Sequence, residues 1–169
     1  MAKISFQNQT TTKMTEFQKL AKQLINSAIK ILNLEKENLC LSIVFVDDKQ
    51  ALKINQEYRH KNYIPDVISF PIMMSEQEIE ALGFREIGDL FICLSEAQRK
   101  TLKYHHTIKE EMAFLFVHGF LHLLSYDHET NKKDEAIMFG LQDQILQANQ
   151  INYEIKFVEA DYQGEENEF

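Results

Sequence analysis

The segment from residue 107 to residue 124 constrains the fold most, because it predicts a helix that is apolar on nearly every side. Thr107 and Glu110 have the spacing of a capping box, so the helix should begin there. The following residues are apolar all around the helix and not along a single stripe: Met112, Phe114, Leu115, Phe116, Val117, Phe120, Leu121, Leu123 and Leu124. A helix of this kind belongs at the centre of a domain, with other elements packed around it.

Three of the six histidines lie on this helix or just after it, as His118, His122 and His128. The first two are four residues apart, so they project from one face of the helix. The polar break after Leu124 lets His128 turn back toward them. Three converging imidazoles are typical of a catalytic zinc site, with a fourth position open for water. We predict that the three histidines bind one Zn²⁺ ion and that His118 takes part in catalysis; core or surface histidines without a metal are the alternative.

Gly119 stands where peptidases with an H-E-x-x-H motif carry their general-base glutamate. Its lack of a carboxylate argues against peptide hydrolysis, and its small size lets a strand or a substrate approach the helix closely. Phosphodiester cleavage depends more on stabilising charge on phosphoryl oxygens, which a metal ion and an arginine can do together. Arg59, at the end of a predicted helix, is the candidate for that catalytic role. A cation that merely interacts with the helix dipole is the alternative.

The remaining pattern predicts an α+β fold with a mixed four- to five-stranded sheet and helices packed mainly on one side. Strands are expected at residues 2–8, 39–46, 67–70 and 90–94, with a strand or an extended return at 151–158. Helices are expected at residues 13–33, 47–58, 96–105, 107–124 and 131–148, with one helical turn near 76–82. Ser95 and Gln98 predict a cap for the helix at 96–105.

Residues 1–158 are expected to form a single metallohydrolase domain, and residues 159–169 a flexible acidic tail. The tail holds five of the 26 acidic residues and no Lys or Arg, so the rest of the chain is only mildly acidic. The net charge of the chain does not support broad nucleic-acid binding. A local basic surface, or simply a solvated helix face, is expected from Arg99, Lys100, Lys103, His105, His106 and Lys109. Without a membrane-spanning stretch or a signal peptide, we expect a cytoplasmic protein that does not bind membranes.

The segment from His118 to His128 resembles the H-G-x-L-H-L-x-G-Y-D-H signature of the bacterial YbeY proteins. Residues 52–59, 66–71 and 88–92 resemble, in the same order, the L-N-x-x-Y-R, T-D-V-L-S-F-P and L-G-D-I-x-I segments of that family. Two residues depart from the pattern. Ser125 replaces the usual Gly, which is strained if the turn needs a positive φ, and Pro65 replaces the usual Thr.

The resemblance implies a mixed-sheet α+β fold with a zincin-like central metal-binding helix. It also implies a zinc-dependent endoribonuclease with His118, His122 and His128 as ligands and with an important Arg59. Single-stranded rRNA regions would be the substrate, in maturation of the 16S rRNA 3′ end and in ribosome quality control. The expected partners are RNA, the ribosome or its small subunit, and ribosomal or assembly-factor proteins. A zinc hydrolase of another class, such as a peptidase, and a non-catalytic ribosome-associated zinc protein remain alternatives.

Overall fold

The computed structural model describes residues 1–127 and 131–153. Four strands and six α-helices follow one another in these residues, with a 3₁₀ turn at Glu35–Glu37. Their order is β1 (Lys3–Asn8), α1 (Thr15–Ile31), β2 (Leu39–Val46), α2 (Asp48–Arg59), β3 (Val67–Pro71), α3 (Glu76–Leu82), β4 (Arg85–Cys93), α4 (Leu94–Tyr104), α5 (Ile108–Leu123) and α6 (Lys132–Ala148).

The strands form one mixed sheet in the order β1-β2-β4-β3. β1, β2 and β4 are parallel, and β3 joins the edge of β4 in the antiparallel direction. β2 lies in the interior of the sheet, as its apolar residues on both faces predicted. A mixed sheet of four strands confirms the expected α+β class.

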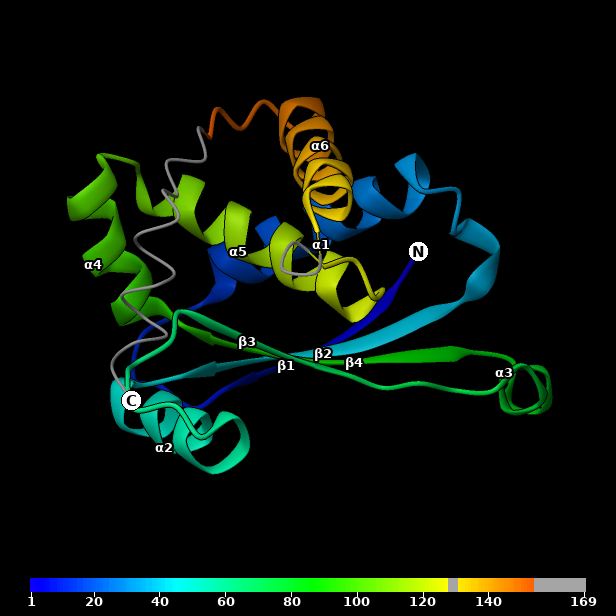
Figure 1. Cartoon of the computed structure of the whole chain (residues 1–169), viewed down its shortest axis with the longest axis horizontal. Coiled ribbons are helices and arrows are strands. Elements are labelled where there is room, and N and C mark those ends of the chain that lie inside the picture. The colour runs from blue at the N-terminus through cyan, green and yellow to red at the C-terminus, as the bar shows by residue number, and fades with distance from the viewer. Residues whose placement is uncertain (128–130, 154–169) are drawn as a thin grey trace.

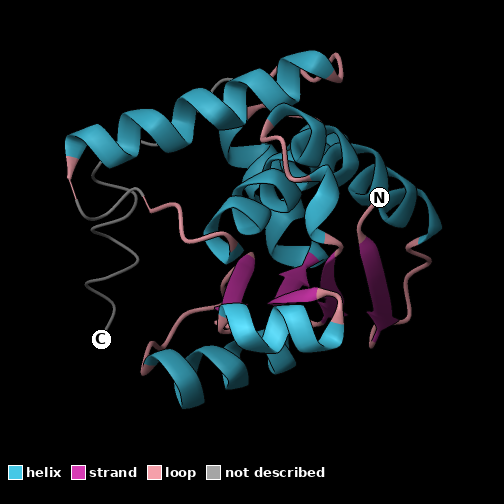
Figure 2. Cartoon of the chain, turned by 90° about the vertical axis from the view of Figure 1, so that its right-hand side faces the viewer, coloured by secondary structure: helices cyan, strands magenta, loops and turns pink. Residues whose placement is uncertain are grey.

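Helices cover the two faces of the sheet unequally, as the sequence predicted. α1, α4, α5 and α6 form the layer on one face, and α2 packs on the other, with α3 beyond one end of the sheet (Figure 1). The view in Figure 2 shows the strands between these two helical layers. Ile43 and Phe45 of β2 belong to the larger core, whereas Val44 and Val46 pack with Ala51 of α2.

α5 is the buried helix at the centre of the larger layer. Twelve of its 16 residues are buried, and it lies against α1, α4, α6 and the sheet. Its N-terminus has the predicted capping box, with Thr107 accepting from the Glu110 amide and Glu110 accepting from the Thr107 amide. The burial of these twelve residues confirms the predicted central position of α5.

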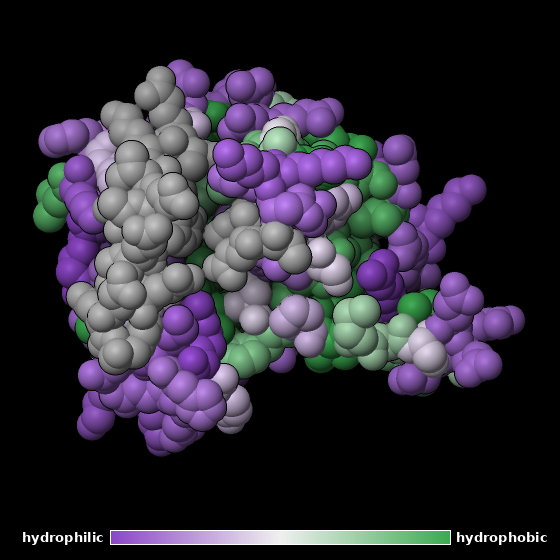
Figure 3. Space-filling model, viewed as in Figure 1, coloured by the Kyte–Doolittle hydropathy of each residue, from purple (hydrophilic) through white to green (hydrophobic). Residues whose placement is uncertain are grey.

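Hydrophilic side chains gather over α2 and α3 at the lower edges of the surface in Figure 3, while hydrophobic ones show nearer the middle.

Two local predictions were wrong. β4 begins at Arg85 and not at residue 90, because Gly88 is a strand residue with φ +133°, where a Cβ atom would lie 2.1 Å from the Phe70 carbonyl oxygen. Glycine here allows close pairing with β3 and does not mark the start of the strand. Ser95 does not cap α4, which begins after Cys93; its hydroxyl donates instead to Asp48 Oδ1 over 2.6 Å.

Near the C-terminus, residues 151–153 follow α6 without regular structure. The rest of the strand or extended return predicted at 151–158, and the acidic tail at 159–169, lie outside the described residues. None of the helices in the described part of the chain is long and apolar enough to cross a membrane.

Candidate active site

His118 and His122 lie side by side on α5, one helical turn apart. Their Nε2 atoms are 3.0 Å apart, and their rings are nearly perpendicular, with an interplanar angle of 77°. Two nitrogen ligands of one tetrahedral zinc ion, each at 2.0–2.1 Å, are separated by about 3.3 Å. The spacing of this histidine pair therefore fits two ligands of a single ion.

The third predicted ligand, His128, lies outside the described residues, so its role stays a prediction. Within the described part of the chain, no group of three or more His, Cys, Asp or Glu side chains could hold a metal ion. The turn that leads toward His128 is described as far as Asp127. It begins with Ser125 at φ 74°, so the turn does require the left-handed conformation that Ser adopts with strain.

Gln142 of α6 contacts the histidine pair from the neighbouring helix. Its side chain is fully buried, and its Oε1 atom is hydrogen-bonded to Nδ1 of His118. Sequence reasoning missed this residue. The sequence did hold a sign of it: Gln142 is an amide between Met138 and Ile145 on the apolar face of α6. A buried amide needs a hydrogen-bond partner, so this position points to a polar neighbour.

A series of ring contacts leads from His118 through Phe114 and Tyr153 to His106. The ring centroid of Phe114 lies 5.1 Å from that of His118, and the ring centroid of Tyr153 lies 4.5 Å from that of Phe114, with the Tyr153 and Phe114 planes nearly parallel. His106 follows, with its ring centroid 4.4 Å from that of Tyr153. These contacts fix the plane of the His118 ring from within the core.

Glu111 contacts the two rings at the end of this series, Tyr153 and His106. It is 1% exposed, accepts from Tyr153 over 3.4 Å and lies 3.0 Å from His106 Nδ1. Burial raises the pKa of the Glu111 carboxyl, and the hydrogen bond with His106 opposes that shift. A buried carboxylate with these two partners ties the start of α5 to the segment after α6.

Gly119, between the two histidines, packs directly on the sheet. A Cβ atom built at this position would lie 2.8 Å from Cδ2 of Leu90, which is itself fully buried in β4. The close approach expected from a small residue is therefore the approach of a strand residue. A glutamate at this position would therefore require Leu90 to move.

Among the described residues, no ion pair or side-chain hydrogen bond joins Arg59 to His118 or His122. Arg59 is the exposed last residue of α2, which packs on the face of the sheet opposite α5 (Figure 1). None of the ion pairs among the described residues involves Arg59. Its neighbour Tyr58 is 67% exposed and rests edge-on against Phe70, with ring centroids 5.5 Å apart.

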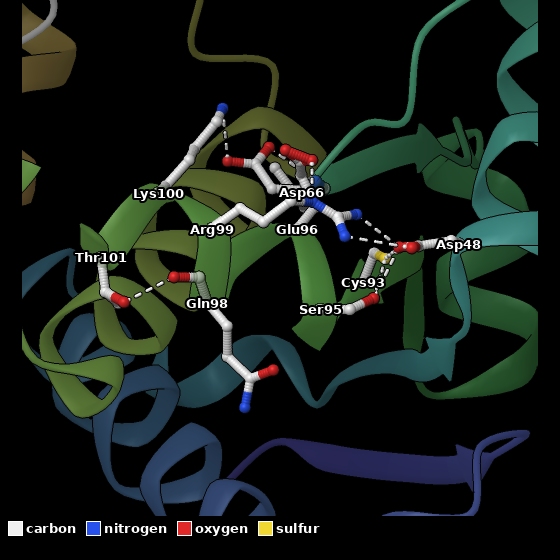
Figure 4. Close-up of polar contacts among 10 residues, drawn as sticks. Asp48, Asp66, Cys93, Ser95, Glu96, Gln98, Arg99, Lys100 and Thr101 are labelled. Carbon is white, nitrogen blue, oxygen red and sulfur yellow. Dashed lines mark hydrogen bonds and ion pairs between the residues drawn. The ribbon is translucent and has the colours of Figure 1, made fainter. Parts of the chain in front are cut away.

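The basic cluster expected before α5 is neutralised in part by local acids. The guanidinium of Arg99 donates two hydrogen bonds, of 2.6 and 3.1 Å, to the carboxylate of Asp48, and Lys100 Nζ donates to Asp66 Oδ2 over 2.9 Å (Figure 4). The hydrogen bonds from Arg99 lower the pKa of Asp48 to about 2. These pairs link α4 to the two ends of the connection between β2 and β3, which indicates a structural role for part of the cluster.

Together, the fold and this geometry define a mixed-sheet α+β protein that presents two histidines, one turn apart, on a buried helix. The family model described as Endoribonuclease YbeY matches residues 3–150. This chain therefore belongs to the endoribonuclease YbeY family. The match confirms the resemblance seen in the sequence.

Curated relatives named Endoribonuclease YbeY match nearly the whole chain. The protein from Mesoplasma florum is 62% identical over 162 residues, covering 96% of this chain and 95% of its own. That from Mycoplasma capricolum is 55% identical, with coverages of 96% and 98%. That from Staphylococcus saprophyticus is 41% identical, with coverages of 88% and 96%.

A solved structure also resembles the fold. The solution structure of TM1509 from Thermotoga maritima aligns with a TM-score of 0.57 at 21% identity, and covers 94% of this chain and 99% of its own. At that identity the likeness concerns the arrangement of helices and strands. It supports the mixed-sheet architecture described above.

Proposed function

We propose that this protein is a zinc-dependent endoribonuclease that cleaves single-stranded regions of rRNA, and that it acts in maturation of the 16S rRNA 3′ end and in ribosome quality control. Membership of the endoribonuclease YbeY family supports the reaction class. The single observation that carries the metal centre is the 3.0 Å separation of the Nε2 atoms of His118 and His122 on a buried helix.

In this proposal His118, His122 and His128 hold one zinc ion. When bound, the ion would supply a Lewis acid that polarises a phosphoryl oxygen and acidifies a water molecule. The rings of Phe114 and His118 stack, so the first ligand would keep its orientation while RNA binds. Gly119 puts no negative charge between the two histidines, which suits an anionic phosphodiester substrate.

Arg59 would bind a phosphate group of the RNA and stabilise negative charge that develops on it. An exposed guanidinium without an ion pair among the described residues is available for bidentate contact with phosphate oxygens. α2 and α5 pack on opposite faces of the sheet, so an RNA strand that contacts both Arg59 and the histidines must pass around the sheet. Single-stranded RNA is flexible enough to follow such a path.

The partners in this proposal are RNA, the ribosome or its small subunit, and ribosomal or assembly-factor proteins that bring the enzyme to its substrate. With rRNA as its substrate, the protein would act in the cytoplasm. The acidic balance of the chain, at −8, favours guidance by such partners over broad attraction to any RNA.

The test compares the wild type with His122→Ala and Arg59→Ala in cleavage of an RNA that carries the 16S 3′ end, with zinc content measured by mass spectrometry. His105→Ala, an exposed histidine on the loop before α5, is the metal control. We expect His122→Ala to lose zinc and cleavage together, and Arg59→Ala to keep zinc but lose about 100-fold or more of the cleavage rate.

Cleavage that survives unchanged in both variants would come from a contaminating nuclease and would contradict the proposal. Turnover of peptides without turnover of RNA would indicate a peptidase. Zinc uptake without multiple-turnover cleavage of RNA would indicate a non-catalytic zinc protein of the ribosome.

A further inference from the structure

The buried face of α6 carries an amide in an apolar setting. Its buried residues are Met138, Gln142, Ile145 and Leu146, and Gln142 is 0% exposed. Burial of an amide costs free energy unless both of its polar ends are satisfied. Only one end is satisfied here, because Gln142 Nε2 has no hydrogen-bond partner among the described residues. A purely structural role would be met better by an apolar side chain, so the position of Gln142 requires another explanation.

The satisfied end of the amide faces His118. Oε1 of Gln142 is hydrogen-bonded to Nδ1 of His118, and a carbonyl oxygen can only accept. Nδ1 therefore carries the hydrogen, and Nε2 of the neutral ring carries the lone pair. The contact with His122 agrees with this assignment, since His122 Nε2, 3.0 Å away, can then donate to that lone pair.

We propose that Gln142 is a positioning residue, which holds His118 in the Nδ1–H tautomer and so presents its Nε2 atom to the metal ion. This role rests on the zinc centre of the proposed function. Phe114 and Gln142 fix different freedoms of the same ring: the aromatic stack fixes its plane, and the amide fixes its rotation and its hydrogen. Hydrogen bonds of this kind orient metal ligands, and their loss typically costs about 10- to 100-fold in metal affinity.

The experiment uses the full-length protein and three variants. Gln142→Met keeps an unbranched chain of similar length but cannot accept the hydrogen bond. Gln142→Glu restores an acceptor. Gln144→Met makes the same change two residues further along, on the exposed side of α6, and is the matched control. Two quantities are measured: zinc affinity by competition with a chelator, and the tautomer of His118 by nitrogen NMR on metal-free protein at about pH 8, above the usual range of imidazole protonation.

We expect Gln142→Met to bind zinc about 10- to 100-fold more weakly and to lose the preference for the Nδ1–H tautomer, with Gln144→Met unchanged. Gln142→Glu should keep the tautomer and bind zinc at least as tightly as the wild type, because a carboxylate raises the basicity of its histidine partner. This rescue separates positioning from packing. It also serves as the test if Gln142→Met fails to fold.

Zinc affinity and tautomer that are equal in the wild type and Gln142→Met would overturn the role of Gln142. Weaker zinc binding by Gln142→Glu than by the wild type would do so as well. A wild-type protein that shows the Nδ1–H tautomer but takes up no zinc would instead overturn the proposed metal centre, and would leave the contact between Gln142 and His118 standing.

Discussion

The backbone N–H of Ser125 donates to the carbonyl oxygen of His122 over 2.9 Å, so the turn that ends α5 is tied to one of the histidines. A second bond, from the Tyr126 N–H to the Leu121 carbonyl, completes a Schellman motif. The motif requires a left-handed residue at its centre, and Ser125 supplies it at φ 74°.

Ser125→Gly should therefore stabilise the protein. A side chain in the left-handed region costs about 1–2 kcal/mol, and the extra freedom of glycine in the unfolded chain takes back roughly 0.5–1 kcal/mol. We expect a net gain of about 0.5–1 kcal/mol, seen as a rise of a few degrees in Tm by calorimetry. Ser125→Ala keeps the Cβ atom and loses only the hydroxyl, so an equal rise in that variant would contradict the explanation.

Two glycines should respond in opposite ways to replacement by alanine. At Gly88 the new Cβ atom would lie 2.1 Å from the Phe70 carbonyl oxygen, and the backbone φ of +133° is unfavourable for alanine. We therefore expect Gly88→Ala to lose about 3 kcal/mol or more of the free energy of unfolding. At Gly140, on the exposed side of α6, nothing lies within 4 Å, and Gly140→Ala should gain up to about 1 kcal/mol from helix propensity. Urea unfolding measures both, and a similar change in the two variants would refute the assigned strain.

Zinc should stabilise the protein against heat through the histidines. An ion that binds only the folded state adds about 2.7 kcal/mol when its concentration is 100 times Kd. His118→Ala, His122→Ala and His128→Ala should each lose most of the zinc-induced rise in Tm, whereas His105→Ala should keep it. An unaltered rise in His128→Ala would remove that histidine from the predicted ligand set.

The pair formed by Asp48 and Arg99 should make stability depend on pH in the acidic range. The folded-state pKa of Asp48 is about 2, below the usual value of about 3.9 expected in the unfolded chain. Its contribution is therefore present above pH about 4 and is lost as the pH falls toward about 2. The Asp48 side chain is 41% exposed, so screening by solvent limits the contribution to about 1 kcal/mol or less.

Asp48→Asn should accordingly lower the free energy of unfolding at pH 6, and the difference from the wild type should become much smaller as the pH falls to 2. Glu80→Gln, an exposed carboxylate on α3, is the control and should change little. A deficit in Asp48→Asn that persists unchanged at pH 2 would show that the hydrogen bonds matter and the charge does not. Urea titrations at several pH values provide the measurement.

Sequence patterns predicted the elements whose signals are local. The capping box at Thr107 and Glu110 marked the start of α5, and the spacing of His118 and His122 placed both rings on one face. Predictions failed where a distant residue decides the outcome. Ser95 has the sequence context of a cap, but its hydroxyl donates to Asp48, 47 residues earlier in the chain. The strand that contains Gly88 was expected to begin only at residue 90, because the close neighbour that requires glycine, Phe70, comes from another strand.

The candidate site follows the same division. The histidine pair belongs to one helix, so its geometry follows from helical periodicity alone. Gln142 reaches His118 from a different helix, and Arg59 lies on a helix across the sheet, so neither position could be derived without the packing of the whole domain. For Gln142, the clue in the sequence was an amide on the apolar face of α6.

The strand order β1-β2-β4-β3 has a consequence for how the chain folds. β4, the last of these strands in the sequence, lies between β2 and β3. Until residues 85–93 are available, β2 has an unpaired inner edge and β3 has no partner, since β3 pairs only with β4 in the described sheet. The first half of the protein therefore emerges during synthesis with unpaired strand edges, and the sheet closes only after its final strand inserts. Non-local pairing of this kind favours slow folding and leaves strand edges open to aggregation.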